Sequence, residues 1–227
     1  MELKIIAKVE SEFTDKFGIP RQSGIVKKSR GKIIFEPEYR MREAVRGLEE
    51  FSHIWILWGF SENEEKTWSP TVRPPRLGGN TRMGVFATRS PYRPNPIGMS
   101  SVELEKIEYT KAGPVLHILG ADILNGTPVY DIKPYLAYTD CHEDATGGFT
   151  GEVKDYFAEV EIPEEMAKGM EKDFLENLTG ILKHDPRPSY KKNETRVYGF
   201  FYGGYEIKFE GIGSRIKVIS IEKEDVK

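Results

Sequence analysis

The sequence predicts a mostly β protein in two parts: an antiparallel barrel or sandwich, then a small α+β domain. Three observations lead to this prediction. Most of the first part consists of short runs rich in β-branched and aromatic residues, bounded by Gly, Pro, Asn or Ser. A polar, glycine-rich stretch follows at 139–155. Beyond it, a helical pattern and a hairpin signal replace the succession of strands, which indicates a different architecture.

In the first part we expect six strands and one helix. The helix is predicted over 39–50, because its apolar residues recur on one face. Loops as long as those expected at 10–24 and 61–82 usually carry function in a compact domain. The expected strands lie at 3–10, 31–36, 51–60, 83–88, 101–109 and 114–123.

The change of composition at 139–155 predicts a domain boundary. We place a first domain at 1–150 and a second at 151–227. The polar boundary indicates that each domain has its own core, so we expect a chain ending near Thr150 to fold by itself.

The second domain is expected to contain a strand at 156–162, then a helix, then three strands. Pro163 suits the first position of the helix, and the basic residues Lys183 and His184 suit its end. The dipeptide Gly203-Gly204 predicts a hairpin turn between the first two of the last three strands.

Composition limits the class of protein. The net charge is −3 and the pI is about 5.9, so any contact with a nucleic acid must use a local basic patch. No apolar run approaches the roughly 20 residues of a membrane-spanning helix, so we expect no membrane partner. The N-terminus lacks the pattern of a signal peptide. Cys141 is the single cysteine, which excludes an internal disulfide and makes the cytoplasm the expected compartment. No cysteine or histidine spacing indicates a metal.

The segment 84–101, GVFATRSPYRPNPIGMSS, is the most informative part of the chain. From Pro70 to Ser100 there are five arginines and no Asp, Glu or Lys. Arg offers a planar, permanently charged set of donors, and proline stiffens the backbone that presents it. The segment therefore predicts a binding site for phosphate, carboxylate or sulfonium-linked groups. A surface loop with structural ion pairs has the same composition and stays an alternative.

Five blocks together resemble the TsaA-like family, whose members with a C-terminal extension are TrmO-type tRNA methyltransferases. The resemblance covers nearly the whole chain, and the Arg/Pro block and the block ending in DIKPY are long and specific. The blocks are FGIPRQSG (17–24), FSHIWILWGF (51–60), TVRPPRLGGNTRMGVFATRSPYRPNPIGMSSVEL (71–104), NGTPVYDIKPYL (125–136) and DPRPSY (185–190).

The resemblance implies a small antiparallel β-barrel that uses S-adenosyl-L-methionine as cofactor. It implies methyl transfer to N6 of threonylcarbamoyl-adenosine, next to the anticodon of certain tRNAs. It also implies a homodimer with the cofactor near the subunit interface. Two other classes of function stay open: a module that binds S-adenosylmethionine or a nucleotide without methyl transfer, and an adaptor whose arginine loop forms salt bridges at a dimer interface.

The resemblance also implies which residues contact the cofactor. Many relatives have His-Gln where this chain has Ser61-Glu62, and many have Asp where it has Asn125. We expect a chain ending near Thr150 to keep cofactor affinity and to lose methyl transfer. The implied cofactor contacts are Pro20, Arg21, Gln22, Ser61, Glu62, Arg89, Met99, Asn125, Gly126, Thr127 and Pro128.

Candidate catalytic residues are Asp131, Asp185 and Tyr190, each with a structural alternative. Asp131 could pair with Lys133 or an arginine, which would lower its pKa and make it a poorer base. The DPRP sequence could be a rigid turn that ends the helix. The candidates for contact with the tRNA substrate are basic residues: Arg93, Lys133, Arg187, Lys191 and Lys192.

Overall fold

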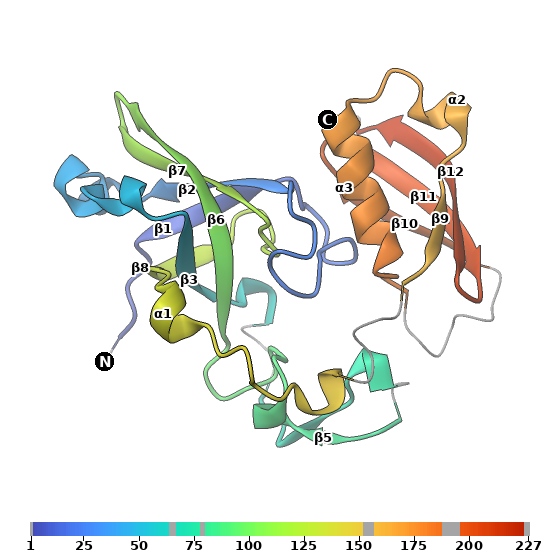
Figure 1. Cartoon of the computed structure of the whole chain (residues 1–227), viewed down its shortest axis with the longest axis horizontal. Coiled ribbons are helices and arrows are strands. Elements are labelled where there is room, and N and C mark those ends of the chain that lie inside the picture. Colours follow the sequence, from blue (N-terminus) through green and yellow to red (C-terminus); the bar gives the residue numbers. More distant parts are fainter. Residues whose placement is uncertain (1, 64–66, 78–79, 152–156, 188–195, 225–227) are drawn as a thin grey trace.

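The computed structural model describes residues 2–63, 67–77, 80–151, 157–187 and 196–224. Six antiparallel strands close into a barrel in the order β1-β2-β7-β6-β3-β8 (Figure 1). This confirms the antiparallel barrel expected for the first part. The strands are β1 (Ala7–Ser11), β2 (Arg30–Phe35), β3 (His53–Gly59), β6 (Ile97–Thr110), β7 (Gly113–Leu119) and β8 (Pro128–Pro134).

Alternating side chains of these strands fill the barrel. In β7, for example, the burial alternates along the strand, and Leu116 and Ile118 are fully or almost fully buried. The barrel closes where β1 pairs with β8, with Ala7 opposite Val129. Closure leaves no free edge among the six strands.

The prediction of one helix over 39–50 is wrong. Three short 3-10 helices occupy this stretch: η1 (Pro37–Tyr39), η2 (Arg42–Val45) and η3 (Leu48–Glu50). Gly47 has a φ of 83°, a left-handed conformation that interrupts any continuous helix. The apolar periodicity still packs the stretch on the barrel, with Val45 buried.

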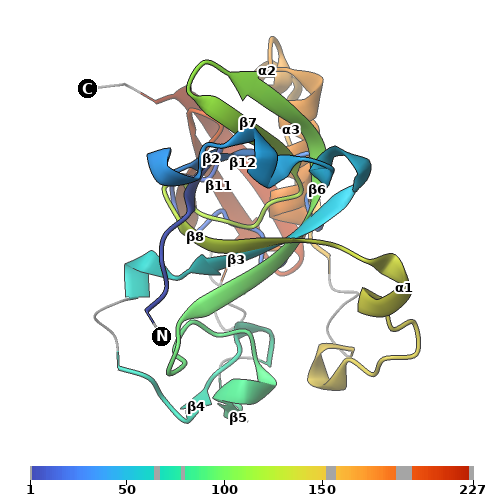
Figure 2. The ribbon, with the colours of Figure 1, turned by 90° about the vertical axis from the view of Figure 1, so that its left-hand side faces the viewer.

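The strand expected at 83–88 is also shorter than predicted. β5 (Met83–Gly84) pairs with β4 (Thr71–Val72), and η6 (Val85–Ala87) follows directly. Both short strands lie at one end of the barrel, away from β7 (Figure 2). The short helices η4 (Ser61–Asn63) and η5 (Pro75–Leu77) complete this region.

The second part is a four-stranded sheet with one helix packed on it (Figure 1). The sheet order is β10-β11-β12-β9, and Tyr202 pairs with Tyr205 around the predicted Gly203-Gly204 turn. The strands are β9 (Glu159–Glu161), β10 (Val197–Tyr202), β11 (Tyr205–Ile212) and β12 (Arg215–Lys223).

The single helix expected after Pro163 is two helices, α2 (Glu164–Ala167) and α3 (Lys172–Lys183). Gly169 separates them with a φ of 85°. Between the barrel and β9, the chain forms α1 (Ala137–Asp140) and η7 (Gly148–Thr150). Among the described residues, no helix is long and apolar enough to cross a membrane.

Two hydrophobic clusters match the two parts, and residues from before the predicted boundary contribute to both clusters. The second cluster, formed mainly by α3 and the sheet, also contains residues of the segment 12–29. This segment reaches from the barrel to α3 and the sheet (Figure 1). The residues of 12–29 in the second cluster or packed against it are Phe13, Phe17, Ile19, Ile25 and Val26. The division at 150 stays a prediction.

Candidate functional site

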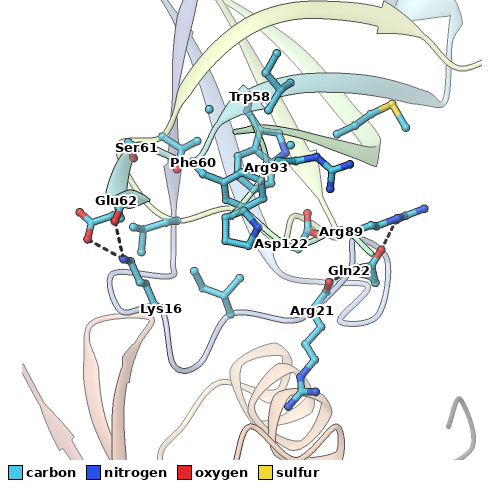
Figure 3. Close-up of a pocket in the computed structure, with 18 of the residues that line it drawn as sticks. Lys16, Arg21, Gln22, Trp58, Phe60, Ser61, Glu62, Arg89, Arg93 and Asp122 are labelled. Atoms are coloured by element: carbon cyan, nitrogen blue, oxygen red, sulfur yellow. Dashed lines mark hydrogen bonds and ion pairs between the residues drawn. The ribbon is translucent and has the colours of Figure 1, made fainter. Parts of the chain in front are cut away.

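A cavity of about 450 Å³ opens beside the barrel, where β3 ends and β6 begins (Figure 3). Its volume falls within the range of about 300–1,000 Å³ that is usual for ligand pockets. Residues from five separate segments line it: Lys16, Ile19, Pro20, Arg21, Gln22, Trp58, Gly59, Phe60, Ser61, Glu62, Thr88, Arg89, Pro91, Arg93, Ile97, Gly98, Met99, Asp122, Leu124 and Thr127.

Most of the predicted cofactor contacts lie on this cavity, although they come from distant parts of the sequence. Three others, Asn125, Gly126 and Pro128, do not line it and belong to the adjacent turn. For all eleven predicted cofactor residues, whether they line the cavity or not, the contact with the cofactor stays a prediction. The predicted cofactor residues on the cavity are Pro20, Arg21, Gln22, Ser61, Glu62, Arg89, Met99 and Thr127.

One wall of the cavity is aromatic. The rings of Trp58 and Phe60 meet edge to face, with centroids 4.5 Å apart. A Cβ at Gly98 would overlap the Trp58 indole, so glycine is needed for the ring to lie here. Met99, with 53% of its surface exposed, adds a polarizable apolar group. Such a wall suits a flat heterocycle.

A hydrogen-bonded chain places a carboxylate in the cavity. Trp58 Nε1 donates to Ser100 Oγ at 3.0 Å, and Ser100 Oγ donates to Asp122 Oδ1 at 2.6 Å. Since an indole can only donate, Ser100 accepts from Trp58 and its single proton points to Asp122. Burial raises the pKa of the Asp122 carboxyl, and the Ser100 hydrogen bond and the nearby Arg89 charge oppose this rise.

Charged groups surround the opening. Arg89 Nη1 donates to the Gln22 side chain, which joins the arginine segment to the loop at 20–22. Lys16 Nζ lies 3.1 Å from Glu62 Oε2 and joins the same loop to η4 (Figure 3). Four cationic side chains and two carboxylates line the cavity, so the lining attracts anions: Lys16, Arg21, Arg89 and Arg93 against Glu62 and Asp122.

Arg93, predicted to contact substrate, lies on this cavity. Its Nη1 donates to the carbonyls of Thr88 at 2.9 Å and Ser90 at 3.3 Å, and its guanidinium lies 6.0 Å from the centre of the Phe86 ring. The loop thus orients the arginine before any ligand arrives.

Asn125, at the position where the family resemblance led us to expect Asp, stands in the turn before β8. Its Oδ1 accepts a hydrogen bond from the Ser11 amide at 3.1 Å, and Gly126 adopts a left-handed φ of 81°. A carboxylate oxygen and an amide oxygen accept this bond equally well in geometry. The turn therefore keeps its attachment to β1 despite the replacement.

Asp131 and Lys133, predicted as catalytic and substrate-binding, pair with each other. Lys133 Nζ lies 2.8 Å from Asp131 Oδ2, and the Ile132 amide donates to Asp131 Oδ1 at 2.9 Å. The hydrogen bond to Asp131 raises the pKa of Lys133. Neither residue lines the cavity. This geometry favours the structural alternative for Asp131, an ion pair with Lys133, over a role as catalytic base.

Asp185 and Arg187 form a buried ion pair in the second domain. Arg187 donates from Nε to Asp185 Oδ1 at 2.8 Å and from Nη2 to the Gly213 carbonyl at 2.7 Å. Their side chains are 2% and 0% exposed and are absent from the cavity lining. This geometry favours a rigid turn over contact with substrate. Tyr190, Lys191 and Lys192 lie outside the described residues.

Several lining residues were not predicted as site residues, and four of them have side chains suited to binding a ligand: Lys16, Trp58, Phe60 and Asp122. Trp58 and Phe60 were within a predicted strand, where aromatic residues are ordinary. Asp122 stands near the end of the apolar run 114–123. An acid in such a run was an available signal, because a carboxylate near a core needs a partner or a function.

Family models match both parts of the chain. The model described as tRNA-methyltransferase O N-terminal domain matches residues 8–141, and the TrmO C-terminal domain matches residues 156–224.

Individual proteins give the same picture. The chain is 40% identical over 225 residues to a tRNA (adenine(37)-N6)-methyltransferase of Escherichia coli K12, with 96% of each chain covered. It is 41% identical to a putative S-adenosylmethionine-dependent methyltransferase of Pseudomonas aeruginosa, covering 86% of this chain and 85% of the relative. Its structure resembles crystallised TrmO from P. aeruginosa with a TM-score of 0.77 and 33% identity, covering 98% of this chain and 97% of that one.

Proposed function

The chain belongs to the TrmO family, and from this premise we propose that the cavity of Figure 3 holds the cofactor and the target nucleotide of a tRNA methyltransferase. The protein is an enzyme that uses S-adenosyl-L-methionine to methylate N6 of the adenine at position 37 of tRNA. The finer substrate, adenosine that already carries a threonylcarbamoyl group on N6, is our proposal.

The assignment of the cavity rests on the fact that predicted cofactor residues from separate parts of the sequence line the same cavity. The loop at 20–22, the helix at 61–63, Arg89, Met99 and Thr127 are far apart in the sequence, and all of them line one hollow. A family resemblance based on residue positions alone does not require this. Independent structural alternatives, such as scattered ion pairs and turns, would leave these residues dispersed.

The lining also fits the chemistry of the cofactor. S-adenosylmethionine supplies a methyl group activated by a sulfonium centre. In the proposed arrangement, the Trp58 and Phe60 wall packs against the adenine, and Arg89 binds the amino-acid carboxylate. Asp122, held by Ser100, offers a carboxylate to the hydrogen-bond donors and positive charge of the cofactor. These residues bind and orient, which brings the methyl group in line with the acceptor nitrogen.

The excess of positive charge around the opening supports the proposed modified base. A threonylcarbamoyl group carries a carboxylate, and the nucleotide carries phosphates. Arg93 is oriented by two carbonyls at the cavity, so it is placed to receive one of these anions. The threonylcarbamoyl carboxylate would thus bring one more anion to this positively charged opening than an unmodified nucleotide offers.

We also propose a homodimer that works in the cytoplasm. Exposed large apolar side chains support a protein contact, since Trp68, Phe86 and Met99 are 52%, 74% and 53% exposed. Light scattering tests the dimer: a mass near twice 25.9 kDa supports it, and a mass near 25.9 kDa contradicts it.

The experiment that tests the function uses labelled S-adenosylmethionine and two samples of one tRNA, with and without the threonylcarbamoyl group. Nucleosides are analysed by mass spectrometry after digestion. We expect methylation of N6 at position 37 in the modified tRNA and much less in the other. Equal labelling of both samples contradicts the proposed substrate. Labelling of neither, with the cofactor bound, favours the binding module over the enzyme.

A further inference from the structure

The segment 12–29 connects the barrel to the C-terminal domain (residues 157–187 and 196–224 of the described chain). On the barrel side, the Asn125 amide donates to the Phe13 carbonyl at 2.8 Å, and the Gly24 amide donates to the Gly120 carbonyl at 2.8 Å. On the other side, Phe13 forms a β-bridge with Tyr202 of β10. Both ends of the segment are thus fixed to the barrel, and its middle faces the other domain.

Phe17 is the main apolar contact of this middle part. Its ring stacks on Tyr198 at a centroid distance of 5.8 Å and an interplanar angle of 4°. It also lies 6.3 Å from the Phe209 ring and 6.5 Å from the Phe200 ring. All three partners belong to β10 and β11. Phe17 is therefore part of the aromatic core of the C-terminal domain, although it belongs to the first family-model match.

The next residue, Gly18, packs tightly against the Phe200 ring. A Cβ at this position would overlap the Phe200 ring, and Phe200 is 1% exposed, so it has little freedom to move away. Glu12 adds polar contacts at the start of the segment. Its carbonyl accepts from the Gly203 amide at 3.1 Å, and its Oε2 accepts from the Tyr202 hydroxyl at 3.0 Å.

The same segment then becomes a wall of the cavity. Ile19 packs against the second hydrophobic cluster and also lines the cavity, and Pro20, Arg21 and Gln22 follow directly. Figure 3 shows Arg21 and Gln22 on this loop beside Arg89, with the C-terminal domain immediately below them. Phe17 and Gly18 themselves do not line the cavity. They can affect a ligand there only through the position of the loop.

We propose that the C-terminal domain positions the cofactor-binding loop through Phe17 and Gly18, so that docking of this domain and binding of the cofactor are coupled. This inference rests on the proposed binding of S-adenosylmethionine in the cavity. It reverses the sequence-based expectation that a chain ending near Thr150 keeps cofactor affinity, because such a chain loses the partners of Phe17. By reciprocity, the cofactor stabilises the contact between the domains by the same free energy.

The test measures the affinity of the full chain for S-adenosylmethionine by calorimetry. In Gly18→Ala, the new methyl group pushes the loop away from Phe200, and we expect the Kd to rise about five- to tenfold or more. The matched control is Gly199→Ala in β10, where a Cβ would meet ordinary contacts at 3.7 Å; its Kd should not change. In the double variant Gly18→Ala, Phe200→Leu, the smaller side chain makes room, and the Kd should return towards that of Phe200→Leu alone.

Rescue separates positioning from general damage, because Phe200→Leu by itself removes packing from the core. If Gly18→Ala does not fold, Phe17→Ala replaces it; this variant removes the stacked ring without adding bulk and should also raise the Kd. An unchanged Kd in a folded Gly18→Ala or Phe17→Ala protein overturns the inference. A raised Kd that the second substitution does not rescue also overturns it. If the wild-type protein does not bind S-adenosylmethionine, the proposed function itself fails.

Discussion

Two pairs of an aspartate and an arginine lie in different environments in this molecule: one at the cavity and one in a buried ion pair. Asp122 and Arg89 lie at the cavity, where Asp122 is held by Ser100 and Arg89 by Gln22. Asp185 and Arg187 lie in the C-terminal domain, where each side chain is at most 2% exposed and the two bond directly. The charged groups of the first pair line the cavity, whereas those of the second pair bond to each other.

The comparison shows what distinguishes a binding site from a structural ion pair of the same composition. The Asp185 and Arg187 side chains bond to each other and are closed off from solvent, so they are not presented to a substrate. At the cavity, the uncharged side chains of Gln22 and Ser100 hold Arg89 and Asp122, and both charged residues line the cavity. The following predictions test this difference, from the largest expected effect to the smallest.

The first prediction concerns the buried pair. Arg187→Ala leaves the Asp185 carboxylate in the core without its guanidinium partner, and we expect it to lower the free energy of unfolding by about 3–5 kcal/mol. Denaturant unfolding measures the loss. The control is Arg215→Ala, which breaks an exposed pair with Glu159 and should change stability little. Equal stability of Arg187→Ala and wild type would mean that the pair is not structural.

The second prediction concerns Arg89. Arg89→Ala should weaken binding of S-adenosylmethionine by about 1.5–3 kcal/mol, because a charge-assisted hydrogen bond to the cofactor is lost. Stability should stay near that of the wild type, the opposite of the result for Arg187. Calorimetry measures the affinity, with Arg82→Ala from the same arginine segment as the control; Arg82 bonds to Thr71 and does not line the cavity. Unchanged affinity in folded Arg89→Ala excludes this contact.

The third prediction concerns the pH dependence that Asp122 causes. Burial raises the pKa of this carboxyl above its usual value near 4. A positively charged cofactor binds the ionised form better, so affinity should fall as the pH falls from neutrality through the raised pKa. The same shift, acting alone, makes the folded state more stable as the pH falls, because the folded state binds the proton more tightly.

Asp122→Asn tests this pH dependence. The variant should bind S-adenosylmethionine more weakly at neutral pH, and its affinity should depend less on pH than that of the wild type. Calorimetric titrations at several pH values measure both effects. Parallel pH profiles for the variant and the wild type would show that another group controls binding.

The fourth prediction concerns exposed ion pairs between the segment 12–29 and α3. Lys28 lies 3.1 Å from Asp173 and 2.7 Å from Glu176, and its hydrogen bonds lower the pKa of both carboxyls. Their stabilising effect is present above the unfolded pKa near 4 and is lost as the pH falls through the lowered values. Because water screens these groups, Lys28→Ala should change the melting temperature and the Kd for S-adenosylmethionine only slightly. A Kd as high as that of Phe17→Ala would show that charge, rather than ring packing, holds the segment.

The sequence predicted the elements whose signals are local. Alternating apolar residues predicted most barrel strands, and Gly203-Gly204 predicted the hairpin that pairs Tyr202 with Tyr205. The helix predicted over 39–50 does not form, and the helix predicted after Pro163 is divided into α2 and α3. Gly47 and Gly169 adopt left-handed conformations in these stretches, which an apolar periodicity does not reveal. The closing pair between β1 and β8 depends on residues about 120 positions apart in the sequence, so no local pattern predicts it.

The candidate site was predicted in part. Arg89 and the loop at 20–22, which the family resemblance implied, line one cavity, and their contacts with the cofactor stay predictions. The resemblance could not reveal Asp122, which is held by a hydrogen bond from Ser100 of β6. The loop predicted at 10–24 is indeed mostly irregular, but its burial was not foreseen, although large apolar residues such as Phe13 and Phe17 indicate it.

The most direct test of the central claim is a crystal structure of the protein with S-adenosylhomocysteine, the demethylated product of the cofactor. The account predicts that the product lies against Trp58 and Phe60, with its carboxylate near Arg89 and a donor within hydrogen-bond distance of Asp122. The Asp185–Arg187 pair should be unchanged and distant from the product. A product bound elsewhere, or one that contacts Arg187 and avoids both Arg89 and Asp122, would contradict the account.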